Sequence, residues 1–153
     1  MSKFSKRKLI ADLKSLNQEG SRKIFSSPFE TNLFFWKSII LGPYLTPMNN
    51  GVFKLFLEFS NNYPNSPPKV KMIKEKPFHP NIYVNGQICL DILQKKWSPG
   101  FSLETILTSI QCLLGDPNTE SPAYLAASEL YVTNRFEYYR KVVKVSKKSW
   151  RFS

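Results

Sequence analysis

Residues 33–59 read LFFWKSIILGPYLTPMNNGVFKLFLEF, two apolar segments joined by a stretch of turn-forming residues. The first segment, 33–41, is mostly apolar on both faces, as a central strand is expected to be. The second, 52–59, alternates apolar and polar residues, which is the period of a strand with one exposed face. Glycine, proline and asparagine punctuate the connection. The stretch therefore predicts two adjacent antiparallel strands.

Weaker strand patterns flank this pair, at residues 23–26 before it and at residues 69–73 after it. Short connections join the four segments in sequence order. Such connections favour antiparallel neighbours over crossovers, so the four strands are expected to form a meander.

The two ends of the chain lack helix-breaking residues. All eleven prolines lie within residues 28–122 and all six glycines within residues 20–115. The ends are therefore expected to be helical. The first helix should cover about fifteen residues and stop at Gly20. Its apolar stripe consists of Leu9, Leu13 and Leu16.

Helical spacing returns at residues 103–114, with Ser102 as the expected N-cap. A short helix is expected at 122–131. A last helix should open at Asn134, which has capping-box spacing to Glu137. Its expected apolar stripe is Phe136, Tyr139, Val143 and Trp150. The pattern predicts one α+β domain over residues 1–153, with an N-terminal helix, a four-stranded antiparallel meander sheet, an irregular loop and three C-terminal helices.

The net charge of +11 is concentrated at the two ends. Residues 1–23 contain seven Lys or Arg against two acids, and residues 135–153 contain seven against one. A basic end attracts acidic proteins, nucleic acid or anionic membrane, or is simply a solvated helix face. A nucleic-acid or chromatin-binding domain is therefore one hypothesis, with Trp150 and Phe152 as stacking groups.

Composition argues against several other classes of protein. No apolar run approaches the roughly 20 residues that cross a bilayer, and no membrane partner or secretory signal is expected. The two cysteines, Cys89 and Cys112, are too few for a disulfide framework and fit a reducing compartment. Cys112 is expected to be a buried thiol. One histidine and no CxxC spacing predict no metal site and no cofactor.

Residues 77–100 show no steady period, which in a small domain is typical of a functional loop. The loop contains Cys89 and the only histidine, His79. On its own, a cysteine between Ile88 and Leu90 is more often a buried small hydrophobe than a nucleophile. A Cys–His protease would need the imidazole within hydrogen-bond reach of the thiol and a third, orienting group. A histidine beside a proline suits that role poorly.

Short motifs surround this cysteine in a fixed order over nearly the whole chain. His79-Pro80-Asn81 lies ahead of Cys89, with eight residues from Asn81 to the cysteine. The others are Gly42-Pro43, Thr46-Pro47, Tyr63-Pro64-Asn65-Ser66-Pro67-Pro68, Trp97-Ser98-Pro99 and Asp116-Pro117-Asn118. Together they resemble the ubiquitin-conjugating enzymes and imply the fold of that family. Segments 88–94, 106–111, 121–123 and 149–151 most resemble the DNA-damage-tolerance and histone-ubiquitylating branch.

The resemblance implies that Cys89 accepts ubiquitin as a thioester from the activating enzyme and passes it to a lysine of a protein substrate, chromatin included. The barrier lies in the oxyanion intermediate and in deprotonating the lysine. Asn81 would donate a hydrogen bond to the oxyanion or only brace the loop, and both roles stay open. His79 is expected to fix the loop shape rather than move protons. No residue is then an obvious base for the thiol.

The family places groups beside the incoming lysine at two positions, here Asp91 and Ser121. An unperturbed lysine has a pKa of about 10.4, so a desolvating apolar rim is expected to help it lose a proton. Ser121-Pro122 also has the minimal form of a proline-directed phosphorylation site, and a phosphate there would add negative charge beside the lysine path.

Family ligases dock on the first helix and two loops, at positions that here hold Lys8, Asn65 and Pro99. Members that serve HECT-type ligases usually carry Phe at the position of Asn65, so a RING-type ligase is expected. The activating enzyme meets the same helix, where Lys6, Arg7 and Lys8 form a basic stripe. The resemblance implies a monomer in the cytoplasm and nucleus. A related modifier in place of ubiquitin stays an alternative.

Overall fold

The computed structural model describes residues 2–19 and 23–151. Along them lie α1 (Lys3–Glu19), β1 (Ile24–Phe29), β2 (Asn32–Leu41), β3 (Val52–Glu58), β4 (Lys69–Ile73), the 3-10 helix η1 (Asp91–Leu93), α2 (Leu103–Gly115), α3 (Leu125–Thr133) and α4 (Arg135–Ser149). The predicted α+β architecture is confirmed. Two residues named above, Gly20 as a helix stop and Phe152 as a stacking group, lie outside the described residues.

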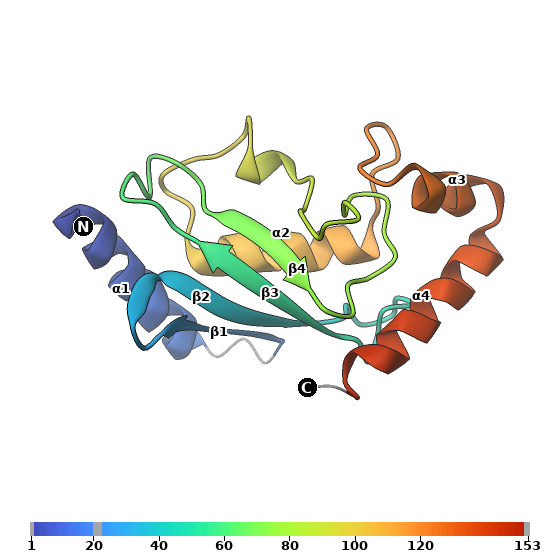
Figure 1. The fold of residues 1–153 in the computed structure, drawn as a ribbon, viewed down its shortest axis with the longest axis horizontal. Helices are drawn as coiled ribbons and strands as arrows, with labels where there is room; N and C mark the ends of the chain where they lie inside the picture. Colours follow the sequence, from blue (N-terminus) through green and yellow to red (C-terminus); the bar gives the residue numbers. More distant parts are fainter. Residues whose placement is uncertain (1, 20–22, 152–153) are drawn as a thin grey trace.

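The strands form one antiparallel sheet in the order β1-β2-β3-β4, the predicted meander (Figure 1). Central strand β2 buries Trp36 and Ile40 on its inner face. Its outer face also carries apolar residues. Phe35 on this face stacks on Phe56 of β3, with ring centroids 5.6 Å apart. Strand β1 is longer than expected and includes Pro28, which an edge strand tolerates.

Helix α2 lies across one face of the sheet and closes the core (Figure 1). Its N-cap is Ser102, as predicted, because the Ser102 side chain accepts a hydrogen bond from the Thr105 amide. The residues that α2 buries are Leu103, Ile106, Leu107, Ile110 and Leu114. Cys112 lies on the other side of this helix and is exposed, so the prediction of a buried thiol is wrong.

Helix α3 begins later than expected, at Leu125. The amides of Ala123 and Tyr124 instead donate to the carbonyl oxygen of Pro80, at 2.8 and 3.0 Å. These bonds hold residues 123 and 124 against the loop that contains Cys89, and the helix starts only after them.

Helix α4 opens at the predicted N-cap, Asn134, but its expected apolar stripe is largely wrong. Phe136 and Trp150 are 78% and 56% exposed. The buried residues are Tyr138, Val142, Ser146 and Ser149. The pattern failed because the buried side of the helix includes small serines, which an apolar stripe does not reveal. Ser149 lies against the sheet, where its Oγ accepts a hydrogen bond from the amide of Val52 at 2.8 Å.

Candidate active site

The loop between β4 and α2 folds back on itself and so places Cys89 beside Asn81. Residues Ile82 and Ile88 form an isolated antiparallel bridge, and the amide of Cys89 donates to the carbonyl oxygen of Asn81 at 2.8 Å. The turn is anchored to β4 because the amide of Met72 donates to the carbonyl oxygen of Gly86 at 2.8 Å.

Gly86 is required at this anchor for two reasons. Its φ is +93°, a conformation that side chains with a Cβ rarely adopt. A Cβ there would also lie 2.2 Å from the carbonyl oxygen of Met72. The sequence thus allows the turn to lie against the sheet, and the turn sets the path of the chain into Cys89.

Cys89 itself is half-buried, between the buried Ile88 and the half-buried Leu90. A thiol that only filled the core would be fully enclosed. Cys89 is thus part of the molecular surface, next to apolar residues.

His79 is fully buried and both of its ring nitrogens are occupied. Nδ1 accepts a hydrogen bond from the amide of Asn81 at 3.0 Å, and Nε2 lies 2.7 Å from the carbonyl oxygen of Leu113. These partners assign the neutral tautomer with its proton on Nε2. Burial lowers the pKa of His79 to about 4, against the raising effect of the Leu113 carbonyl. The ring therefore links the loop to α2 and does not form the Cys–His pair of a protease.

Asn81 is 2% exposed and binds the backbone of Asn118 twice. Its Nδ2 donates to the carbonyl oxygen of Asn118 at 2.7 Å, and its Oδ1 accepts from the amide of Asn118 at 2.8 Å. The bracing contacts are thus present. An amide nitrogen carries two hydrogens, so the bond to Asn118 leaves a second donor on the same atom.

Asp91 begins η1, two residues after Cys89, and its side chain is 55% exposed. One carboxylate oxygen accepts from the amide of Ile92 at 2.8 Å, and the other lies 3.3 Å from Nζ of Lys96. An exposed pair of this kind contributes about 0–1 kcal/mol and is readily exchanged. The carboxylate is therefore able to meet another amine.

Ser121 is exposed and follows the segment that Asn81 braces. The hydrogen bond from the amide of Ala123 to the carbonyl oxygen of Pro80 holds this segment against the loop. The structure thus links the segment of Ser121 to the turn of His79 and Asn81 by backbone hydrogen bonds.

The sequence reasoning missed Asn118, Leu113 and Pro80 as partners in this site. Asn118 lies 37 residues from Asn81. All three act through backbone groups, which residue type does not reveal. The signal available was that Asn118 and Pro80 each belong to one of the motifs around the cysteine.

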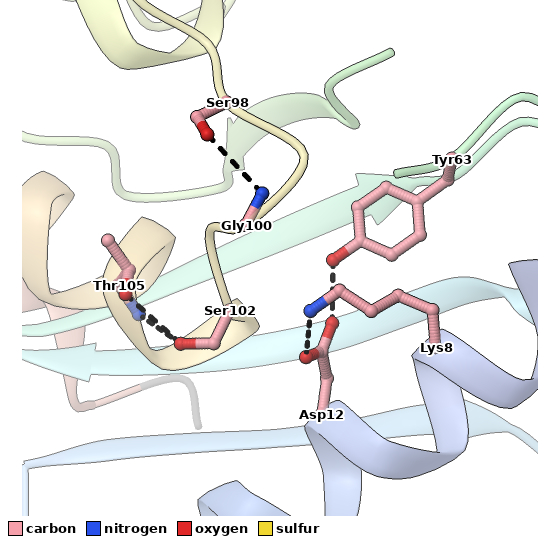
Figure 2. Close-up of polar contacts among 7 residues, drawn as sticks. All are labelled: Lys8, Asp12, Tyr63, Ser98, Gly100, Ser102 and Thr105. Carbon is pink, nitrogen blue, oxygen red and sulfur yellow. Dashed lines mark hydrogen bonds and ion pairs between the residues drawn. The ribbon is translucent and has the colours of Figure 1, made fainter. Parts of the chain in front are cut away.

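Lys8, Asn65 and Pro99 are brought to one end of the molecule by a polar network and a bridging tryptophan. Lys8 Nζ lies 2.7 Å from one oxygen of buried Asp12, whose other oxygen accepts from the hydroxyl of Tyr63 at 2.6 Å (Figure 2). The indole N–H of Trp97 donates to the carbonyl oxygen of Pro64 at 2.8 Å, which ties the two loops together. Asn65 and Pro99 are exposed beside this bridge.

The comparison with protein families gives one match that covers most of the chain: the family described as ubiquitin-conjugating enzyme matches residues 8–146. The chain belongs to the ubiquitin-conjugating enzyme family. It is 45% identical over 150 residues to "Ubiquitin-conjugating enzyme E2 2" of Trichoderma harzianum, covering 98% of this chain and 99% of that protein. It is 48% identical over 150 residues to "Ubiquitin-conjugating enzyme E2 1" of Caenorhabditis elegans, covering 98% and 78%.

A ubiquitin-conjugating enzyme is a transferase that carries ubiquitin as a thioester. Its partners are therefore ubiquitin, an activating enzyme and a ligase. Two further findings bear on the class of site. Among the described residues no cluster of histidine, cysteine and acidic side chains could hold a metal ion, and no described helix has the length and apolarity of a membrane span.

Proposed function

We propose that Cys89 is the residue that carries ubiquitin and that Asn81 and Asp91 assist its transfer to lysine. The observation that carries this proposal is the pair of hydrogen-bond links at Asn81. Its carbonyl oxygen holds the amide of Cys89, and its side chain holds the backbone of Asn118. One residue thus holds the backbone of Cys89 and places a polar amide on the same loop.

In the loading step, the Cys89 thiolate attacks the carbonyl carbon of the ubiquitin thioester on the activating enzyme. The tetrahedral intermediate collapses, a new S–C bond replaces the old one, and the thiolate of the activating enzyme leaves. Thioester exchange is nearly neutral in free energy. The chain needs to supply a donor for the oxyanion, and the second N–H of Asn81 is the proposed donor.

In the transfer step, a lysine amine attacks the thioester on Cys89, an N–C bond forms, and the Cys89 thiolate leaves. The nitrogen also loses a proton, which passes to bulk water. Asp91 attracts the incoming ammonium group because its pairing with Lys96 is weak and exposed. The exposed Ser121 is proposed to line the same path. His79 takes no part in the proton transfer because both ring nitrogens are occupied.

The test is to mix the protein with activating enzyme, ATP and ubiquitin and to look for a reductant-sensitive adduct on a gel. Cys89→Ser should convert the adduct into a reductant-stable ester. Cys112→Ser is a matched control because Cys112 is the more exposed thiol. A loss of the adduct in Cys112→Ser, with Cys89→Ser unaffected, would refute the assignment.

A RING-type ligase is the proposed partner at Lys8, Asn65 and Pro99. The exposed amide of Asn65 offers less apolar surface for burial than a phenylalanine would. A panel of ligases is expected to show discharge with RING ligases and poor transfer to a HECT cysteine. Strong transfer to the HECT cysteine would contradict this proposal.

We also propose that the enzyme belongs to the DNA-damage-tolerance and histone-ubiquitylating branch, as a monomer of the cytoplasm and nucleus. The support is the resemblance of segments 88–94, 106–111, 121–123 and 149–151. Three relatives named "E2 2", at 45–46% identity, are compatible with it. Ubiquitin transfer to histones in nucleosomes, against free lysine as a reference, would test the branch.

A further inference from the structure

A cavity of about 550 Å³ lies between the end of β2, the loop 42–51 and the C-terminal end of α4. It shares no lining residue with the loop 77–100 or with the ligase-docking positions. In Figure 1 this end of α4 lies below the sheet, whereas η1, drawn in olive, lies near the top. The lining residues that matter most are Lys23, Tyr44, Val52, Lys147 and Trp150.

The rim of this cavity combines exposed aromatic rings with cations. Tyr44 and Trp150 are 66% and 56% exposed. Lys23 Nζ lies 5.6 Å from the centroid of the Tyr44 ring, and Lys147, three residues before Trp150, also lines the cavity. Proteins that bind single-stranded nucleic acid combine these two kinds of side chain: the bases stack on the aromatic rings, and the cations neutralise the phosphates.

The fold holds the walls of the cavity in place. The hydrogen bond from the amide of Val52 to Ser149 Oγ fixes the end of α4 on β3. On the opposite wall the amide of Gly42 donates to the carbonyl oxygen of Gly51 at 2.9 Å. A Cβ at Gly42 would lie 1.7 Å from the carbonyl oxygen of Met48, so the chain at Gly42 packs directly against the backbone of Met48.

Positive charge continues from the cavity along α4. A second cavity, of about 410 Å³, is lined by Glu137 and three cations of this helix. Glu137 is the one acid in α4, and it pairs with Arg140 at 3.2 Å. The exposed cations of α4 form a line at helical spacing: Arg140, Lys141, Lys144, Lys147 and Lys148. Such a line matches a chain of regularly spaced phosphates.

We propose that the first cavity, which we call the groove, and the exposed cations of α4 together bind single-stranded nucleic acid. Bases would stack on Tyr44 and Trp150, and phosphates would pair with Lys23, Lys147 and the α4 line. An acidic peptide would use the same cations but would gain no stacking from two exposed rings, so the nucleic acid is favoured. The groove shares no residue with the loop that contains Cys89. The enzyme could therefore bind nucleic acid and transfer ubiquitin at the same time.

The test is fluorescence anisotropy of a labelled oligo-dT at several salt concentrations. Each phosphate contact contributes about 0.7 to the salt dependence on single strands, so Lys23→Ala and Lys147→Ala should each reduce the slope by about 0.7. Trp150→Ala should weaken binding by about 5-fold or more and leave the slope unchanged. Tyr44→Ala should do the same, and it serves as a second variant because Trp150 caps α4.

Lys69→Ala is the matched control, since Lys69 is an exposed lysine on β4 outside the groove. Thermal unfolding and ubiquitin loading of each variant check that the fold is intact. If Lys69→Ala reduces the slope as much as Lys147→Ala, attraction is diffuse and the proposed site is wrong. If polyglutamate competes as well as oligo-dT and neither aromatic variant weakens binding, the groove is a site for acidic peptides, and the proposal is again wrong.

Discussion

At the scale of single residues, Asn81 has two proposed roles, bracing the loop and donating to the oxyanion. Its side chain is bound on both sides to Asn118, so bracing is part of the folded structure. The oxyanion role depends on the second hydrogen of Nδ2. An aspartate keeps the shape and the acceptor for the Asn118 amide, but it loses both Nδ2 hydrogens, so the bond to the Asn118 carbonyl oxygen and the proposed oxyanion donor disappear together. The two roles are therefore distinguished by two measurements, one of the reaction rate and one of stability.

Asn81→Asp is expected to slow discharge onto free lysine by about 100-fold or more, the effect of losing one oxyanion donor in other enzymes. Single-turnover discharge of the loaded enzyme measures the rate, and thermal unfolding measures the bracing. A discharge rate within about 10-fold of the parent, together with a lower unfolding temperature, would leave Asn81 with the bracing role alone.

His79 predicts a pH dependence of stability. Its pKa is about 4 in the folded protein and near 6.5 in the unfolded chain. Between these values the unfolded state binds more protons, so stability falls as the pH falls. Lowering the pH from about 7.5 to about 5.5 should reduce the free energy of unfolding by about 1 kcal/mol. Urea unfolding at both pH values measures it.

The control for this prediction is His79→Gln, which removes the only imidazole of the chain but keeps a donor for the carbonyl oxygen of Leu113. This variant should lose that part of the pH dependence. An equal loss of stability between the two pH values in the parent and in His79→Gln would show that other groups cause it.

At the scale of elements, the loop between β4 and α2 forms the site through backbone contacts. Spacing predicted the strands and α2 because their burial repeats with a regular period. The same reasoning failed for α4, whose buried side includes Ser146 and Ser149. It also failed for Cys112, because apolar character alone does not say which side of a helix is covered. Asn118 was missed because it acts through its backbone.

Gly86→Ala tests how the turn in this loop depends on its anchor. The substitution forces a Cβ into contact with the carbonyl oxygen of Met72 at a positive φ, with a cost of about 1–3 kcal/mol. Ubiquitin loading should slow as well, because the turn sets the path into Cys89. Gly100→Ala is the control, since a Cβ there meets only Ser98 Oγ at 3.7 Å. Equal unfolding temperatures for the two variants would argue against the anchor.

At the scale of the whole molecule, the net charge of +11 is divided between two surfaces. On α1, Lys6 and Arg7 are exposed, whereas the charge of Lys8 is offset by Asp12. This face is the proposed meeting point with the activating enzyme. On α4 the cations belong to the proposed nucleic-acid groove. The two surfaces are therefore testable independently.

Raising the salt concentration should slow ubiquitin loading more than discharge onto free lysine, because steering by exposed charge weakens as salt screens it. Rates of both steps at low and high salt measure this. Lys6→Glu with Arg7→Glu should slow loading and remove most of its salt dependence, and Lys147→Ala should change neither. Equal salt effects on both steps would exclude steering by α1.

The most direct measurement of the role of Cys89 is differential alkylation of the two cysteines before and after loading with ubiquitin. In the unloaded protein iodoacetamide should modify both thiols, since Cys112 is exposed and Cys89 is half-buried. After loading, peptide mass spectrometry should find Cys89 protected and Cys112 still modified. Treatment with reductant should make Cys89 reactive again. Protection of Cys112, with Cys89 still alkylated, would contradict the assignment of Cys89 as the carrier of ubiquitin.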